Sequence, residues 1–104
     1  MKTVTVRYKT KPEFAVENEA LIARVFEALA KEKPAGLRYQ AMREEEGNVF
    51  VHVASVQEGI DHPLLKLLAF QEFQAGIKQR CEEPPTVLPM KLVGRFDGLT
   101  PGHP

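Results

Sequence analysis

Four stretches of the chain carry the hydrophobic pattern of β-strands. The predicted strands cover residues 3–9, 37–43, 49–56 and 86–96. The first alternates strictly between polar and apolar side chains, as a strand with two different faces does. The third is the richest in β-branched residues. An acidic turn that contains a glycine joins the second strand to the third, which predicts a hairpin.

A helical repeat of apolar positions follows the first strand and runs to about Lys33. The start of this helix has two interpretations. Thr10 can be the N-cap residue, with Glu13 closing a capping box. Alternatively, Lys11 is the N-cap and Pro12 takes the first helical position, where its missing N–H costs nothing.

A second helix is predicted between the third and fourth strands. It starts at Asp61 or His62, just ahead of Pro63, and it runs to about Glu82. The proline pair that follows, residues 84–85, is expected to end it.

This order of elements, β-α-β-β-α-β, predicts an α+β domain with a ferredoxin-like fold. We expect an antiparallel four-stranded sheet with two helices on one face. One domain is predicted over residues 1–97, and a flexible tail over residues 98–104. The third and fourth strands are apolar on both sides, so the second face of the sheet should also be buried. The simplest cover is a second copy of the chain, which predicts a homodimer.

The charge balance and the cysteine content limit the partners and the compartment. Fourteen basic and fourteen acidic residues give a formal net charge of zero, so the long-range attraction that nucleic acid or an anionic membrane needs is missing. We therefore expect no nucleic-acid partner and no membrane partner. Cys81 is the only cysteine, and the chain start shows no signal segment, which together predict a cytoplasmic protein.

A family resemblance rests on residues 50–63, Phe-Val-His-Val-Ala-Ser-Val-Gln-Glu-Gly-Ile-Asp-His-Pro, and on residues 68–73, Leu-Ala-Phe-Gln-Glu-Phe. A strand, a short loop and a helix with a Phe-x-x-Phe pair, here Phe70 and Phe73, follow one another. This pattern resembles the antibiotic biosynthesis monooxygenase-like group of the dimeric α+β barrel superfamily. The resemblance implies that two copies pair into a dimeric α+β barrel. It also implies a hypothesis for the activity, the cofactor-independent oxidation of a small aromatic or quinol-like substrate.

Two departures from the group's pattern concern this activity. Many active members carry a tryptophan at the end of the third strand and a histidine just before the first Phe of the pair. Here those places hold Ser55 and Ala69, and the chain has no tryptophan. The resemblance thus implies the fold and the dimer without carrying the oxygenase residues over. A non-catalytic ligand-binding dimer and a structural or interaction module are the alternative functions.

His52 and Asn18 are the candidate catalytic residues. His52 alternates with Val51 and Val53, and if these valines face the helices, His52 points into the cavity of the dimer. There it would act as an acid or base or bind a ligand; the alternative is a histidine bonded to a neighbour within the sheet, or one exposed at an edge. Asn18 lies in the apolar face of the first helix, where an unpaired amide costs about 1–3 kcal/mol. It either bonds to a strand end or loop, or it orients a ligand.

The candidate binding residues are Arg7, Tyr8, Arg38, Gln40, Phe50 and Phe70. If Arg7, Arg38 and Gln40 converge with His52, the site suits an anionic or carbonyl-bearing small molecule. The alternative for each arginine is a solvated side chain or an ion pair between subunits. Tyr8 and Tyr39 are each interpreted as a core aromatic or as a site phenol. We predict no cofactor and no metal, because the histidines show no three-ligand spacing.

Overall fold

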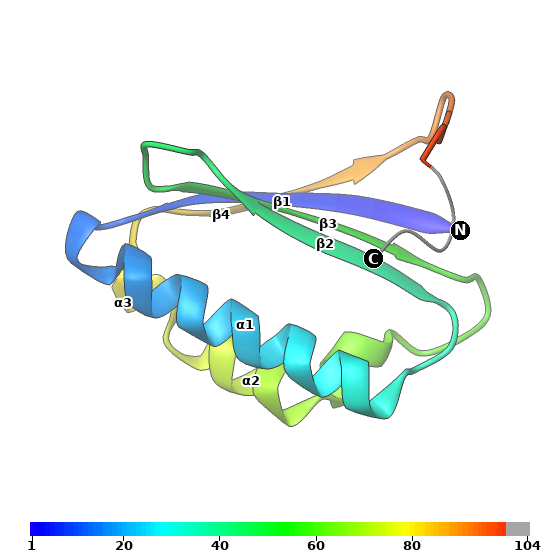
Figure 1. Ribbon diagram of the computed structural model, residues 1–104, viewed down its shortest axis with the longest axis horizontal. Coiled ribbons are helices and arrows are strands. Elements are labelled where there is room, and N and C mark those ends of the chain that lie inside the picture. Colours follow the sequence, from blue (N-terminus) through cyan, green and yellow to red (C-terminus); the bar gives the residue numbers. More distant parts are fainter. Residues whose placement is uncertain (100–104) are drawn as a thin grey trace.

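The computed structural model of the protein describes residues 1–99. Four antiparallel strands form one sheet in the order β2-β3-β1-β4, so that β2 and β4 are its edges. The strands are β1 (Lys2–Thr10), β2 (Leu37–Arg43), β3 (Val49–Val56) and β4 (Cys81–Met90). All helices lie on one face of this sheet (Figure 1). The predicted α+β class and ferredoxin-like βαββαβ order are therefore confirmed.

The first helical region begins after Lys11, with Pro12 at the first helical position of a short 3₁₀ turn, η1 (Pro12–Phe14). It continues as α1 (Ala15–Glu32) and ends at Lys33, which adopts the left-handed conformation. The interpretation with Lys11 and Pro12 is thus confirmed. The capping box is wrong, because the hydroxyl of Thr10 is buried without a hydrogen-bond partner among the described residues.

The second helical region is divided into three segments, where the sequence predicted one helix. They are η2 (Pro63–Lys66), α2 (Leu68–Ala75) and α3 (Ile77–Arg80). His62 caps the first, since its Nδ1 accepts a hydrogen bond from the Leu64 N–H. The chain is extended at Leu67, and Gly76 separates the last two segments. The helical pattern hid both breaks because the apolar positions continue across them.

Strand β4 corrects the predicted end of the chain's regular structure, because it runs over Cys81–Met90 and not over residues 86–96. Pro84 and Pro85 lie inside it, at a register shift where the pairing passes from Lys9–Glu83 to Arg7–Thr86. A proline has no N–H to give to a ladder, and an edge strand with a bulge tolerates it. The helix thus ends at Arg80, before the prolines, and the expectation that the proline pair ends it is wrong.

Residues 91–99 have no regular secondary structure. Of the tail predicted over residues 98–104, residues 100–104 lie outside the described residues. In the described part of the chain, no helix is long and apolar enough to cross a membrane.

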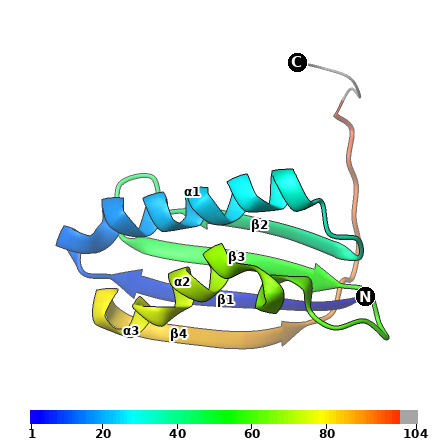
Figure 2. The ribbon, with the colours of Figure 1, turned by 90° about the horizontal axis from the view of Figure 1, so that it is seen from below.

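The core lies between the helices and the sheet, with α1 over the β2–β3 side and α2 and α3 over the β1–β4 side (Figure 2). Its buried residues are Tyr8, Val25, Phe50, Leu64, Leu67 and Phe73. The opposite face of the sheet, the outer face, presents Val51 and Val53 of β3, which pair with Arg7 and Thr5 of β1. No helix of residues 1–99 covers the outer face.

Two valines of α1 test this packing. Val25 is 1% exposed and Val16 is 75% exposed. We expect Val25→Ala to lower the free energy of unfolding by about 2 kcal/mol, because two buried methyl groups are lost and a cavity remains. Val16→Ala should change it by less than about 0.5 kcal/mol. Urea unfolding followed by circular dichroism measures both, and equal losses would contradict the orientation of α1.

Candidate functional site

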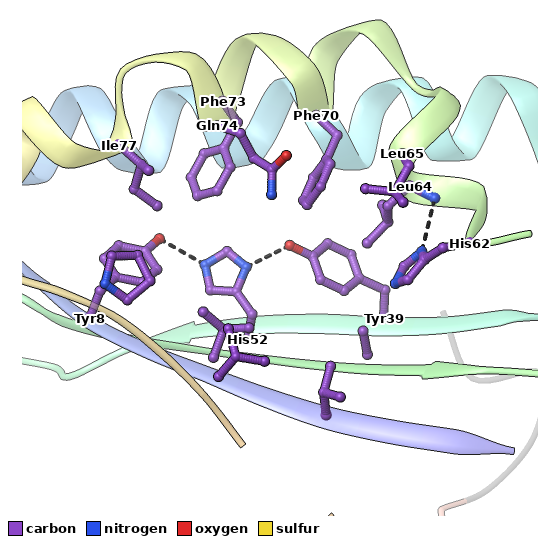
Figure 3. A pocket seen from close by; sticks show the side chains of 15 residues that line it. Tyr8, Tyr39, His52, His62, Leu64, Leu65, Phe70, Phe73, Gln74 and Ile77 are labelled. Atoms are coloured by element: carbon purple, nitrogen blue, oxygen red, sulfur yellow. Dashed lines mark hydrogen bonds between the residues drawn. The ribbon is translucent and has the colours of Figure 1, made fainter. Parts of the chain in front are cut away.

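A cavity of about 370 Å³ lies between the sheet and the segments η2 and α2. Its walls are mostly apolar and aromatic. Phe70, Phe73 and Ile77 project into it from the helical side (Figure 3). Val6 and Ala54 line it on the side of the sheet. Leu65 and Val87 border it and are both 58% exposed, which places its opening between η2 and the edge strand β4. The cavity thus lies within one subunit.

A line of hydrogen-bonded side chains crosses the wall of this cavity (Figure 3). His52 lies at its centre on β3, with a tyrosine on each side. Its Nε2 is 2.8 Å from the hydroxyl of Tyr8 on β1, and its Nδ1 is 2.5 Å from the hydroxyl of Tyr39 on β2. All three side chains line the cavity. Val6 is the partner of His52 in the sheet, and Tyr8 lies two residues from Val6 on the same face of β1. Tyr39 is the partner of Ala54, which lies two residues from His52 on β3. Both tyrosines are therefore neighbours of His52.

The line continues behind Tyr8, away from the cavity. Asn18 of α1 donates from Nδ2 to the Tyr8 hydroxyl over 2.8 Å. Arg80 of α3 donates from Nε to Asn18 Oδ1 over 3.0 Å, and from Nη2 to the carbonyl oxygen of Phe73 over 2.7 Å. We call this line of five hydrogen-bonded side chains, Arg80–Asn18–Tyr8–His52–Tyr39, the polar chain. Asn18 is fully buried and Arg80 is 4% exposed, so these bonds replace the water that both groups lose on folding.

Burial keeps the central members of the polar chain uncharged. Desolvation lowers the pKa of His52 to about 4, so the imidazole is neutral at neutral pH. Desolvation raises the pKa of both tyrosine hydroxyls above the ordinary value, and for Tyr8 the hydrogen bond from Asn18 acts in the opposite direction. The cavity therefore meets neutral hydrogen-bonding groups rather than an ion pair.

Arg80 is the cation of the polar chain, and it lacks the usual partner. Within residues 1–99, no carboxylate lies within ion-pair distance of it. Its guanidinium instead packs on the ring of Phe73, with 5.2 Å between Cζ and the ring centroid. Burial lowers the pKa of Arg80, but an arginine remains protonated at neutral pH. A positive charge thus stands at the inner end of the polar chain.

The structure corrects the expected direction of His52. The sequence placed it in the cavity of a dimer on the condition that Val51 and Val53 face the helices. These valines lie on the outer face, and His52, 4% exposed, points toward the helices. The alternation was read correctly, but the pattern is apolar on both faces and does not tell which face the helices cover.

The expected convergence of Arg7, Arg38 and Gln40 with His52 is wrong. Arg7 lies on the outer face and pairs with Glu83 over 3.0 Å. Arg38 and Gln40 line a hollow of about 410 Å³ on that same face, together with Arg95. The sheet separates all three predicted binding residues from His52, because neighbouring residues of a strand point to opposite faces.

The other predicted site residues lie on the helix side of the sheet. Tyr8 and Phe70 line the cavity. Phe50 stacks on Tyr8 with 5.4 Å between ring centroids, and it belongs to the core rather than to the cavity wall. Asn18 bonds to Tyr8 and does not line the cavity, so it meets a strand residue as the first interpretation expected. Their roles toward a ligand stay predictions.

Sequence reasoning missed Arg80 and placed Tyr39 only among two possible site phenols. Arg80 follows Phe73 and Ile77 at helical spacing, so its position beside the apolar stripe was a signal for a buried charge. Within residues 1–99, no group of three or more His, Cys, Asp or Glu side chains is placed to hold a metal ion.

Comparison with solved structures gives the fold a context. A crystal structure of an antibiotic biosynthesis monooxygenase is 20% identical, with 90% of this chain and 100% of that chain covered and a TM-score of 0.70. Rv0793 from Mycobacterium tuberculosis is 15% identical, with 92% of this chain and 98% of that chain covered and a TM-score of 0.72. NE2512, a protein of unknown function from Nitrosomonas europaea, is 16% identical, with 95% of each chain covered and a TM-score of 0.69. No protein-family model and no curated protein matches the sequence.

The chain has the antibiotic biosynthesis monooxygenase-like fold. The resemblance inferred from the Phe-x-x-Phe helix is thereby confirmed at the level of fold. Identities of 15–20% carry the architecture and leave the activity to be argued from the site.

The neutral state of His52 predicts a pH dependence of stability. Its pKa is about 4 in the folded protein and 6.5 ordinarily, so the unfolded chain takes up the proton first as the pH falls. Stability is therefore lost from about pH 7 downward, by about 2 kcal/mol between pH 7.5 and pH 5. His52→Gln keeps one donor and one acceptor for the two tyrosine hydroxyls but does not titrate there, and should lack this loss.

Urea unfolding of both proteins at pH 7.5, 6 and 5, at one protein concentration, measures the difference. The remaining histidines and carboxylates are common to both proteins and cancel. Equal pH dependence in the two proteins would show that His52 is not the buried neutral group.

Proposed function

We propose that the protein binds a small planar aromatic molecule in the cavity of each subunit and oxidises it with O₂, without a bound cofactor. The observation that carries this proposal is the cavity itself: aromatic walls surround one line of neutral polar groups. Ligand sites commonly combine a mostly apolar lining with a few placed polar groups. The name of one solved neighbour, an antibiotic biosynthesis monooxygenase, supports the reaction class.

The size of the cavity favours a ligand of two or three rings. An apolar protein cavity of about 150 Å³ is enough to hold benzene, and this one has about 370 Å³. Phe70 and Phe73 lie on the helical wall, with Tyr39 and His52 opposite them (Figure 3). Flat rings between these side chains would gain offset or edge-to-face contacts.

Oxidation without a cofactor requires a substrate that supplies its own electrons. When a ring CH₂ becomes C=O, one atom of O₂ enters the product and the other leaves as water with the two hydrogens. The protein then has to orient the substrate and stabilise the oxygen-bearing intermediate. In this proposal His52 is the catalytic residue at the cavity wall. Asn18, which bonds to Tyr8 and Arg80 and does not line the cavity, is a positioning residue.

A non-catalytic ligand-binding protein is the second candidate, and one observation favours it. Both ring nitrogens of His52 are engaged by the hydroxyls of Tyr8 and Tyr39. A general base needs a free lone pair within reach of the proton that it takes. The histidine can serve as a base only if the bond to one tyrosine gives way when the substrate binds.

We propose further that two copies pair through the outer face, as the two-sided apolar strands predict. Met42, Leu88 and Met90 are between 47% and 54% exposed, and the register places them on the outer face beside half-buried Val51 and Val53. These five apolar side chains share a face that no helix of the described residues covers, and exposed apolar groups gathered in this way are typical of interaction surfaces. A two-fold pairing would bury each copy's face against the other. The cytoplasmic location stays a prediction from the single cysteine.

Oxygen uptake in the presence of anthrone tests the reaction. We expect the protein to accelerate the conversion of anthrone to anthraquinone above the spontaneous rate, with one labelled oxygen from ¹⁸O₂ in the product. Leu65 borders the cavity and Leu68 does not, although both leucines are exposed. Leu65→Trp should therefore return the rate toward the spontaneous one, and Leu68→Trp should leave it unchanged.

Binding of anthrone without any acceleration would favour the non-catalytic candidate. Equal rates in the Leu65→Trp and Leu68→Trp proteins would place the reaction outside this cavity.

Sedimentation equilibrium tests the pairing. Val51→Lys puts two like charges near the proposed two-fold contact, and it should raise the dimer dissociation constant at least about tenfold, or about 1.4 kcal/mol. Val16→Lys changes an exposed position of α1 and should leave the constant unchanged. A wild-type protein that stays monomeric, or an equal response of the two variants, would contradict pairing through the outer face.

A further inference from the structure

Arg80, at the inner end of the polar chain, determines which group donates and which accepts in each hydrogen bond of the chain. The Nε of Arg80 can only donate, so Asn18 must turn its Oδ1 toward it. The Nδ2 of Asn18 then faces Tyr8, and an amide nitrogen also can only donate. The hydroxyl oxygen of Tyr8 is thus an acceptor toward Asn18.

This leaves one place for the proton of the Tyr8 hydroxyl. The hydroxyl is fully buried and has two hydrogen-bond partners, Asn18 and His52. Asn18 Nδ2 has no lone pair to offer, so the proton goes to Nε2 of His52. In the opposite arrangement the buried hydroxyl proton has no acceptor, which costs about 1–3 kcal/mol. Nε2 of His52 is therefore the unprotonated nitrogen.

The neutral ring of His52 carries its single N–H on the other nitrogen, Nδ1, which faces Tyr39. The Tyr39 hydroxyl oxygen accepts this bond, so its own proton points elsewhere. Within residues 1–99, the Tyr39 hydroxyl has no other hydrogen-bond partner. It lies at the centre of the cavity wall, beside His52 (Figure 3).

We propose that the polar chain makes Tyr39 a hydrogen-bond donor into the cavity, and that the bound molecule carries an acceptor oxygen, a carbonyl or a phenolate, on its aromatic rings. This rests on the proposed function in one respect, that the ligand occupies this cavity. The donor favours a carbonyl or phenolate oxygen over an O–H group, because a ligand hydroxyl that accepts from Tyr39 needs a further partner for its own proton.

The proposal assigns a role to two residues that do not touch the ligand. Asn18 and Arg80 are positioning residues that set which way the chain points. Asn18→Asp tests this, because it replaces the amide by a carboxylate of the same shape that still pairs with Arg80. A carboxylate can only accept, so the Tyr8 proton turns toward it. His52 then donates from Nε2, Tyr39 donates to Nδ1, and Tyr39 becomes an acceptor toward the cavity.

The tautomer of His52 reports the direction without any ligand. In the ¹⁵N-labelled protein at pH 7.5, nitrogen-15 NMR of the histidine ring should show the proton on Nδ1. In Asn18→Asp it should lie on Nε2. Circular dichroism and urea unfolding check that the variant is folded. A wild-type ring with its proton on Nε2, or a folded variant whose tautomer is unchanged, would overturn the assigned direction.

Three ring compounds of nearly equal shape test the ligand class: 9-fluorenone carries a carbonyl, 9-hydroxyfluorene an O–H, and fluorene neither. We expect the wild-type protein to bind 9-fluorenone roughly fivefold more tightly than fluorene, as one neutral hydrogen bond allows. Tyr39→Phe should remove this difference, because the aromatic ring is kept and the donor is lost. Asn18→Asp should shift the preference from 9-fluorenone to 9-hydroxyfluorene.

The carbonyl stretch of bound 9-fluorenone gives a second readout, since a hydrogen bond lowers its frequency. The shift should be present in the wild type and absent in Tyr39→Phe. Equal affinities for 9-fluorenone and fluorene in the wild type would overturn the donor role while leaving an aromatic cavity. If none of the three compounds binds, the proposed function fails together with the ligand class, and the tautomer measurement still decides the direction of the polar chain.

Discussion

The hydrogen bonds from Arg80 to Tyr39 connect five elements of the fold in one continuous line. Arg80 belongs to α3 and Asn18 to α1, while Tyr8, His52 and Tyr39 stand on β1, β3 and β2. Each of these groups loses water on folding, so each needs the next one as a partner. The helices and the sheet therefore have to meet in one relative position, and the polar side of the cavity wall follows from that position.

The two ends of the polar chain have different tasks: the inner end contributes to stability, and the outer end faces the ligand. At the inner end, Arg80 is held by Asn18, the Phe73 carbonyl and the Phe73 ring. At the outer end, only one partner of the Tyr39 hydroxyl lies among residues 1–99. The breaks in the second helical region also serve the cavity. Because the chain is extended at Leu67, η2 and α2 form a wall that a single straight helix would not.

The two faces of the sheet have separate tasks in this picture. His52, Tyr8 and Tyr39 belong to the cavity side, whereas Arg7, Arg38 and Gln40 lie with the valines of β3 on the outer face. The solved neighbours share this architecture at 15–20% identity. Shared architecture at these identities does not fix the site, so the polar chain has to be understood from the residues of this protein itself.

The sequence by itself determined the order of the elements and the burial of Asn18, and it limited the start of the first helical region to Thr10 or Lys11-Pro12, because each depends on residues close together along the chain. It also placed His52 on the face opposite to Val51 and Val53. Only the tertiary structure decided which face the helices cover, since both faces are apolar in pattern. Only the structure could bring Arg80 to Asn18, 62 residues away. The contacts that orient the polar chain join distant segments, and no local pattern records them.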